Sequence, residues 1–338
     1  MTKRIVRVVG IVLLLSGLAF LGWFIPAKAG MFANDREEMV ERYADAPSQF
    51  ITVDGVPIHV RVEGNGAGKA FPLLMLHGSL VNMHEWDPTA ERLKKDYRII
   101  RVDWPPYGLS GPNPKGYTTP EAARLVALVL DKLNVQKVGV ISTSNGANVA
   151  LSLNAMYPER VAALAFSILP IERPSQTRDV DWKIKTGLAF HEAVMPEYHP
   201  MIWYRWILHD TGPKAGWNPP QELSQIMYDM GNLPNAISNQ KQYLADNTRL
   251  FKTTDYGAVA EQVKVPVLLQ WCWDDTVISQ GPEATVRRFT NTQVKVIEYK
   301  GVGHWPMWEI PDRFANDNRA FFDAVGAQIA AAAPAPQP

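Results

Sequence analysis

Residues 138–151 read VGVISTSNGANVAL and contain the turn around which the rest of the chain is arranged. A β-branched apolar run ends at a cluster of small residues, and an alanine- and leucine-rich helical pattern begins at once. A strand that turns directly into a helix exposes its turn residue beside free helix N–H groups, which stabilise negative charge. The stretch therefore predicts a nucleophile elbow with Ser144 at its tip. The usual G-x-S-x-G pattern is altered, because Ser142 stands in place of the first glycine.

The composition is that of a globular α/β protein with a full apolar core. The chain has 338 residues, 46% of them hydrophobic, and its 34 basic residues equal its 34 acidic residues in number. Without a net charge or a basic stripe, we expect no nucleic-acid partner. Cys272 is the one cysteine, which excludes an intramolecular disulfide. The seven histidines include no H-x-x-x-H pair, so we expect neither a metal nor an organic cofactor.

The N-terminus carries a hydrophobic segment. Lys3, Arg4 and Arg7 precede an uncharged, mostly apolar run over residues 8–25, which reaches the lower length limit for a membrane-spanning helix. An A-x-A motif follows at residues 27–29 and resembles a signal-peptide cleavage site. We interpret residues 1–30 as a signal peptide or a membrane anchor, and length favours the anchor. The basic flank places the rest of the chain outside the cytoplasm: membrane-anchored if the segment stays, or secreted or periplasmic if it is cleaved.

Strands alternate with helices through two parts of the chain, residues 49–169 and 256–330. Residues 50–53 and 58–62 flank an Asp54-Gly55 turn and predict a β-hairpin. The further strands are expected at 71–76, 97–102, 138–143, 162–169, 265–271 and 294–299, and the helices at 87–95, 119–133, 282–289 and 311–330, with Thr119 as a helix cap. This alternation predicts a doubly wound, mostly parallel sheet with its ligand site beyond the carboxyl ends of the strands.

The alternation stops over residues 170–255, which read as helical. An all-helical insertion after a central strand predicts a lid over the strand ends. It is rich in aromatic and methionine residues, of which we expect most to form the lid core and a few to line an apolar pocket: Trp182, Phe190, Met195, Met201, Trp203, Tyr204, Trp206, Trp217, Met227 and Met230. Residues 331–338 alternate alanine and proline, and we expect them to be disordered.

A serine nucleophile near neutral pH requires a general base, which is commonly a histidine oriented by a carboxylate. In a fold of this kind the partners follow later strands in the order serine, acid, histidine. Ser144 follows the strand at 138–143, Asp275 the strand at 265–271, and His304 the final strand. The sequence therefore predicts a catalytic triad of Ser144, Asp275 and His304.

Several ordered motifs support the same interpretation. They are His77-Gly78, Asp103 with Gly108-x-Ser110, residues 157–161 (YPERV) and residues 303–306 (GHWP). Together with the elbow and Asp275, they make residues 49–325 resemble an α/β-hydrolase with a helical lid. The resemblance implies Ser144 as nucleophile, Asp275 as carboxylate and His304 as base. It also implies an oxyanion hole formed by the backbone N–H groups of Asn145 and Ser79, with Leu80 as the alternative to Ser79.

Alternatives remain for each member of the site. Ser142 is a second candidate nucleophile, although it precedes the turn. Asp274 and Glu172 compete with Asp275 for the acid position. For the base, the other candidates are the lid histidines His191, His199 and His209, while His77 is interpreted as a structural loop residue. Cys272 is interpreted as a small buried filler.

The resemblance implies acyl transfer to water. We expect hydrolysis of a carboxylic ester of a small to medium apolar substrate through an acyl-enzyme. A serine at the elbow argues against relatives that use aspartate there, the epoxide hydrolases and haloalkane dehalogenases. A lactonase, a carbon–carbon bond hydrolase and a non-catalytic ligand-binding relative remain alternatives, because the fold does not choose among them.

Overall fold

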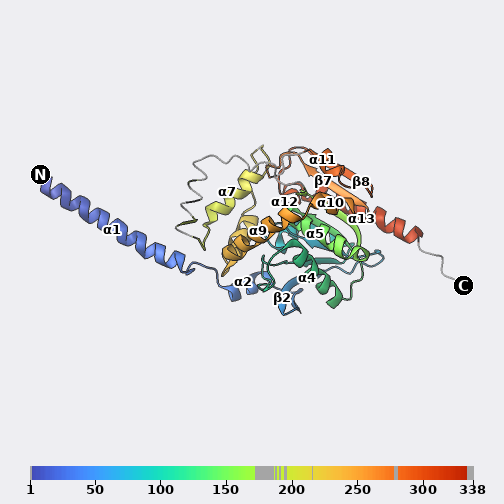
Figure 1. Cartoon of the computed structure of the whole chain (residues 1–338), viewed down its shortest axis with the longest axis horizontal. Coiled ribbons are helices and arrows are strands. Elements are labelled where there is room, and N and C mark those ends of the chain that lie inside the picture. Colours follow the sequence, from blue (N-terminus) through green and yellow to red (C-terminus); the bar gives the residue numbers. More distant parts are fainter. Residues whose placement is uncertain are drawn as a thin grey trace.

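The computed structural model describes residues 2–171, 186, 189, 192–193, 196–214, 216–277 and 281–332. Eight strands form one sheet in the order β1-β2-β4-β3-β5-β6-β7-β8 (Figure 1). Their bounds are β1 Ser48–Val53, β2 Val56–Glu63, β3 Leu73–Leu76, β4 Ile99–Val102, β5 Val138–Thr143, β6 Val161–Ser167, β7 Val267–Cys272 and β8 Val294–Tyr299. β2 is antiparallel to β1 and β4, and the remaining pairs are parallel. The predicted doubly wound, mostly parallel sheet is confirmed.

Helices follow most of the parallel strands. They are α1 Thr2–Lys28, α2 Arg36–Tyr43, α3 Asp87–Leu93, α4 Thr119–Lys132, α5 Ser144–Met156, α7 Met201–Thr211, α8 Gln221–Gly231, α9 Ala236–Thr253, α10 Tyr256–Glu261, α11 Pro282–Val286, α12 Pro306–Glu309 and α13 Pro311–Ala332. Short 3₁₀ turns span Met83–Trp86 and Pro158–Arg160.

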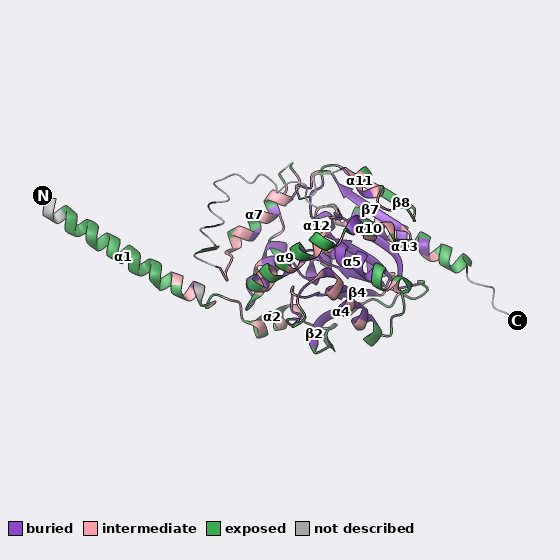
Figure 2. Cartoon of the chain, viewed as in Figure 1, coloured by how far each residue is buried: buried purple, intermediate pink, exposed green. Residues whose placement is uncertain are grey.

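The central strands of the sheet are buried on both faces, and Figure 2 shows them between helices. Successive strand residues point to opposite sides, so Leu74 and Val140 pack in one apolar cluster, which includes Leu125 of α4 and Leu151 of α5. Their neighbours Leu73 and Ile141 pack in a second cluster, which includes Phe314 and Phe322 of α13. Burial on both faces explains why these strands read as continuous apolar runs.

Two details of the sequence prediction are wrong. The cap of α4 is Thr118, whose side chain accepts a hydrogen bond from the N–H of Glu121, whereas Thr119 lies inside the helix and bonds the Tyr256 hydroxyl. The expected tail at 331–338 also begins too early, because Ala331 and Ala332 belong to α13. Residues 333–338 lie outside the described part of the chain.

α1 contains a stretch that is long and apolar enough to cross a membrane. Residues Ile5–Ala27 have a mean hydropathy of 2.5, and none of the most apolar window is buried. Figure 1 shows α1 projecting away from the body of the protein. A signal sequence has the same properties, so the anchor over residues 8–25 stays a prediction.

Residues 34–43, which follow α1, contact the helices between β6 and β7. The backbone N–H of Asn34 donates to the carbonyl oxygen of Asn232 at 2.8 Å. Arg42 and Tyr43 of α2 both bond Oδ2 of Asp229 in α8, at 2.9 and 2.6 Å. Because Asp229 is buried, its charge requires these partners. The segment next to α1 is therefore fixed to the helices that follow β6.

The part of the chain between β6 and β7 contains α7, α8, α9 and α10. Tyr204 and Leu208 of α7 and Leu223 and Met227 of α8 are buried in the second apolar cluster, as expected for lid core residues. Trp206 is 39% exposed, so it is not a core residue. Trp182, Phe190 and Met195 lie outside the described residues. The lid boundaries at 170 and 255 stay a prediction.

Candidate active site

Ser144 stands at a strained turn between β5 and α5. Its φ is +50°, a conformation that is uncommon for residues other than glycine, and its backbone N–H donates to the carbonyl oxygen of Ile168 at 2.9 Å. Position 146 requires glycine, because a Cβ there would lie only 2.3 Å from the carbonyl oxygen of His77. Ser142, the rival nucleophile, is fully buried in β5, with its hydroxyl directed at the carbonyl oxygen of Ala165. The local geometry thus favours Ser144 over Ser142.

The structure brings Asp275 and His304 together from the ends of β7 and β8. Nδ1 of His304 lies 2.9 Å from Oδ2 of Asp275, and both residues are less than one tenth exposed. The backbone N–H of His304 donates to the carbonyl oxygen of Thr211, so α7 fixes the histidine loop. A Cβ at Gly303 would collide with the backbone at Gly212 and Pro213, so only glycine permits this approach. This carboxylate–imidazole pair is the arrangement that orients a general base.

The rival acids and bases do not form this pair among the described residues. Oδ2 of Asp274 accepts a hydrogen bond from the backbone N–H of Lys214. His199 is held in the lid, where its backbone N–H donates to Oδ1 of Asn232. His209 lies in the last turn of α7. Glu172 and His191 lie outside the described residues.

The two predicted oxyanion residues are neighbours. Nδ2 of Asn145 donates to Oγ of Ser79 at 2.9 Å. A Cβ on Gly78 would lie 3.3 Å from Cβ of Ser144, so the turn that carries Ser79 lies against the candidate nucleophile. Leu80, the alternative donor, has a positive φ of 68°. The proximity agrees with an oxyanion hole at Ser79 and Asn145, whose donor role stays a prediction.

The His-Gly and Asp-to-Gly-x-Ser motifs form a buried framework beneath the site. Asp103 accepts from the N–H groups of Met83 and Leu109 and lies 2.8 Å from Nδ1 of His59. Burial alone would raise the pKa of Asp103, but His59, His77 and the backbone N–H hold it at about 2. His77 is fully buried, which lowers its pKa. It therefore has the surroundings of a structural residue.

Glu85 is a candidate site residue that the sequence reading missed. It is 1% exposed, and its Oε2 accepts a hydrogen bond from the backbone N–H of Gly78 at 2.8 Å. Burial raises the pKa of Glu85 to about 7, against the opposing effects of the Gly78 N–H and His304. No sequence pattern identifies it, because its two partners come from residues 78 and 304.

Three carboxyl groups act on the imidazole of His304. Burial by itself lowers the pKa of His304, but the pair with Asp275 and the charges of Glu85 and Glu309 outweigh this effect and raise it above 6.5. A general base works in its neutral form, and a raised pKa keeps the ring protonated to higher pH. Activity should therefore be lost as the pH falls through this raised value.

We expect kcat/KM of the wild type to have an acid limb above pH 6.5, the ordinary value for histidine. The Glu85→Gln variant removes one of the charges that favour the imidazolium, so its acid limb should move to lower pH. Rate profiles between about pH 5 and 9 measure both. Glu298→Gln changes an exposed carboxylate on β8 and serves as the control. Its acid limb should stay at the same pH as that of the wild type. An unmoved limb in Glu85→Gln would contradict the role of this charge.

Comparison with known proteins agrees with the fold and the ordered motifs. A family model described as the alpha/beta hydrolase fold matches residues 72–187. A 2-hydroxy-6-oxononadienedioate/2-hydroxy-6-oxononatrienedioate hydrolase from Paraburkholderia phymatum is 26% identical, over 83% of this chain and 96% of its own. The chain has the α/β-hydrolase fold, and the proteins that it resembles most fully in sequence are hydrolases.

Solved structures resemble this chain over nearly their whole length. A membrane phospholipase A described as a bacterial virulence factor has a TM-score of 0.67 and 22% identity, and the match covers 96% of this chain and 99% of that one. A thermophilic esterase from Thermogutta terrifontis has a TM-score of 0.65 and 18% identity, covering 83% of this chain and 100% of its own. At these identities the likeness concerns the fold.

Proposed function

We propose that the chain is a serine hydrolase that cleaves a carboxylic ester through an acyl-enzyme, with Ser144 as nucleophile, His304 as base and Asp275 as its carboxylate. The observation that carries the proposal is the buried Asp275–His304 pair at 2.9 Å in a fold that presents Ser144 on a strained elbow. A membrane phospholipase A and an esterase, both acting on esters by name, share this fold, so the fold is compatible with the choice of bond.

In the proposed path, Oγ of Ser144 attacks the ester carbonyl carbon while Nε2 of His304 takes the hydroxyl proton. Asp275 stabilises the imidazolium through Nδ1, and the N–H groups of Ser79 and Asn145 bind the oxyanion. The imidazolium then protonates the leaving alcohol, and the alcohol departs. Water attacks the acyl-enzyme with His304 again as base, which releases the acid and restores Ser144.

A second candidate is hydrolysis of a carbon–carbon bond beside a carbonyl group. The observation that favours it is the similarity to 2-hydroxy-6-oxononadienedioate/2-hydroxy-6-oxononatrienedioate hydrolases, of which the Paraburkholderia protein matches over 83% of this chain. The same three side chains suit both reactions, so the substrate decides between them.

Two groups of helices support proposals about the location of the enzyme and the class of its substrate. We propose that α1 anchors the enzyme in a membrane, with the catalytic domain outside the cytoplasm, because its basic residues precede the apolar run. The apolar lid helices α7 and α8 beside the histidine loop favour a small to medium apolar acyl or alcohol group.

The test combines a covalent label with a substrate panel. We expect a fluorophosphonate probe to label Ser144, as identified by peptide mass spectrometry. Hexanoate should exceed acetate as a p-nitrophenyl ester by about tenfold or more in kcat/KM, because each buried methylene contributes ~0.8 kcal/mol. Folded protein that is not labelled would favour a ligand-binding relative without turnover. Faster cleavage of a 2-hydroxy-6-oxo-dienoate than of any ester would favour the carbon–carbon hydrolase.

A further inference from the structure

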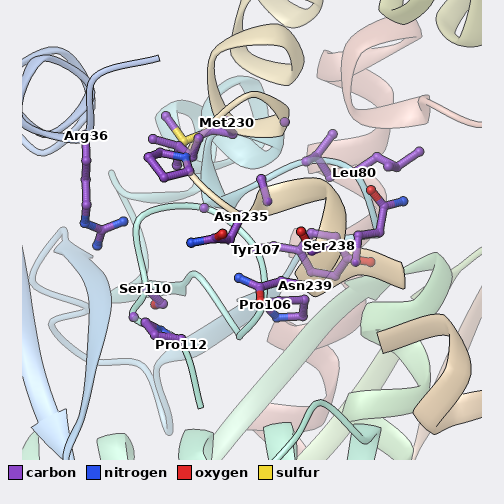
Figure 3. Close-up of a pocket in the computed structure, with 18 of the residues that line it drawn as sticks. Arg36, Leu80, Pro106, Tyr107, Ser110, Pro112, Met230, Asn235, Ser238 and Asn239 are labelled. Atoms are coloured by element: carbon purple, nitrogen blue, oxygen red, sulfur yellow. The ribbon is translucent and has the colours of Figure 1, made fainter. Parts of the chain in front are cut away.

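A cavity of about 480 Å³ lies between a core loop and the lid helices (Figure 3). Its core side is formed by the loop that contains Pro106, Tyr107 and Ser110, and its lid side by the end of α8 and the start of α9. This volume is within the range of pockets that hold small organic ligands. Ser144 and His304 are not among the residues that line it, so the cavity is distinct from the space directly at these side chains.

The cavity connects two chemically different places. Figure 3 shows Leu80 and Arg36 on opposite sides of it. Leu80 directly follows Ser79, whose hydroxyl bonds Asn145 at the proposed oxyanion hole. Arg36 is the first residue of α2 and follows the segment that joins α2 to α1. A ligand that fills the cavity therefore extends from the catalytic turn toward the part of the chain next to the hydrophobic helix.

Arg36 gives this cavity its only charge among the described residues that line it. The other lining side chains are apolar, such as Met230 and Leu233, or neutral and polar, such as Asn235 and Asn239. One N–H of Arg36 donates to the carbonyl oxygen of Leu109, and a guanidinium has five such donors. Arg36 is half-buried, and this burial lowers its pKa against the opposing charge of Asp103. A partly desolvated guanidinium with donors to spare favours an oxyacid anion.

Tyr107 provides a second, independent sign of a ligand. It is 7% exposed and lines the cavity, yet its hydroxyl has no hydrogen-bond partner at ordinary distance among the described residues. Burial raises the pKa of Tyr107, and a long contact of its hydroxyl with the Ser79 side chain opposes that rise. This long contact leaves the buried hydroxyl without a full hydrogen bond, which an oxygen of a bound molecule would supply.

We propose that this cavity binds the anionic end of the substrate, a carboxylate or phosphate group paired with Arg36, while the scissile ester lies beyond Leu80 at Ser79 and Asn145. This inference rests on the proposed function and adds a substrate class to it: esters that carry a negative charge remote from the reacting carbonyl. The charge comes either from the phosphate of a lipid headgroup or from the carboxylate of a soluble acyl compound.

The experiment measures binding without turnover, in the full chain in detergent micelles with Ser144→Ala. Two matched pairs serve as probes: monomethyl adipate against methyl hexanoate, and dioctanoyl phosphatidylglycerol against dioctanoylglycerol. Calorimetric titration gives the affinity ratio within each pair. We expect Arg36→Gln to lower the charged-to-neutral ratio about 10- to 100-fold, as for loss of a charge-assisted pair. A smaller loss is expected in Arg36→Lys, which keeps the charge without the planar fork.

The pair whose affinity ratio falls in Arg36→Gln identifies the source of the anion. A fall in the adipate pair indicates a soluble acid, and a fall in the phosphatidylglycerol pair indicates a lipid. Arg249→Gln removes an equal charge from an exposed position on α9, 73% exposed by side chain, and should leave both ratios unchanged. Unchanged ratios in both Arg36 variants overturn the proposal, as does an equal change in Arg249→Gln. The affinity ratios do not depend on turnover. If the fluorophosphonate probe failed to label Ser144 in the wild type, the proposed function would be refuted and the affinity ratios would still test the binding of an anion at Arg36.

Discussion

Replacement of Ser144 by alanine is expected to lower kcat for ester hydrolysis by about 10⁴- to 10⁶-fold, the scale seen when a triad nucleophile is removed. The physical reason is that the reaction requires the hydroxyl at the tip of the elbow, beside the N–H groups at the start of α5. Alanine keeps a side chain of similar size at the same φ of +50°, so the fold and the midpoint of thermal unfolding should change little. Steady-state kinetics and circular dichroism measure the two effects.

Ser142→Ala is the matched control for this prediction. Ser142 is buried in β5, and its hydroxyl has only a long contact of 3.5 Å with the carbonyl oxygen of Ala165. Its removal should change kcat by less than about tenfold, because the deletion affects packing beneath the elbow alone. If Ser142→Ala were inactive and Ser144→Ala active, the nucleophile would be Ser142 and not Ser144.

Substitution of Asp275 by asparagine should have the second largest effect, a loss of about 10⁴-fold in kcat. Asparagine fits the same space but presents an amide to Nδ1 of His304, now 2.9 Å from the carboxylate. The amide cannot stabilise the imidazolium. It also favours the tautomer that carries its proton on Nε2, the nitrogen that must accept the proton of Ser144. The loss should be measured in kcat at the pH optimum, with unfolding followed in parallel.

Asp274→Asn tests the neighbouring acid with the same chemical change. Oδ2 of Asp274 accepts from the backbone N–H of Lys214, and the amide oxygen of asparagine accepts that bond equally well. We expect less than about a threefold change in kcat, in line with a substitution away from the core. If Asp274→Asn caused the larger loss, the carboxylate of the pair would have been misassigned.

The amino-acid sequence predicted the fold through local patterns. Continuous apolar runs such as residues 71–76 identified the buried parallel strands, because a strand covered on both faces has no polar side. Boundaries were less accurate where propensity does not distinguish adjacent residues: two threonines precede Pro120, and only the bond to the Glu121 N–H shows that Thr118 is the cap.

The sequence alone also predicted that Ser144, Asp275 and His304 lie near one another. Each of them follows a predicted parallel strand, and the carboxyl ends of parallel strands meet at one edge of the sheet. The tertiary structure decided what is adjacent across long separations. It placed Glu85 by Gly78 with its charge acting on His304, fixed Asp229 to α2, and put Arg36 and Tyr107 in one cavity. Such contacts join residues without common periodicity or spacing, since they depend on how loops and lid helices pack after the sheet has formed.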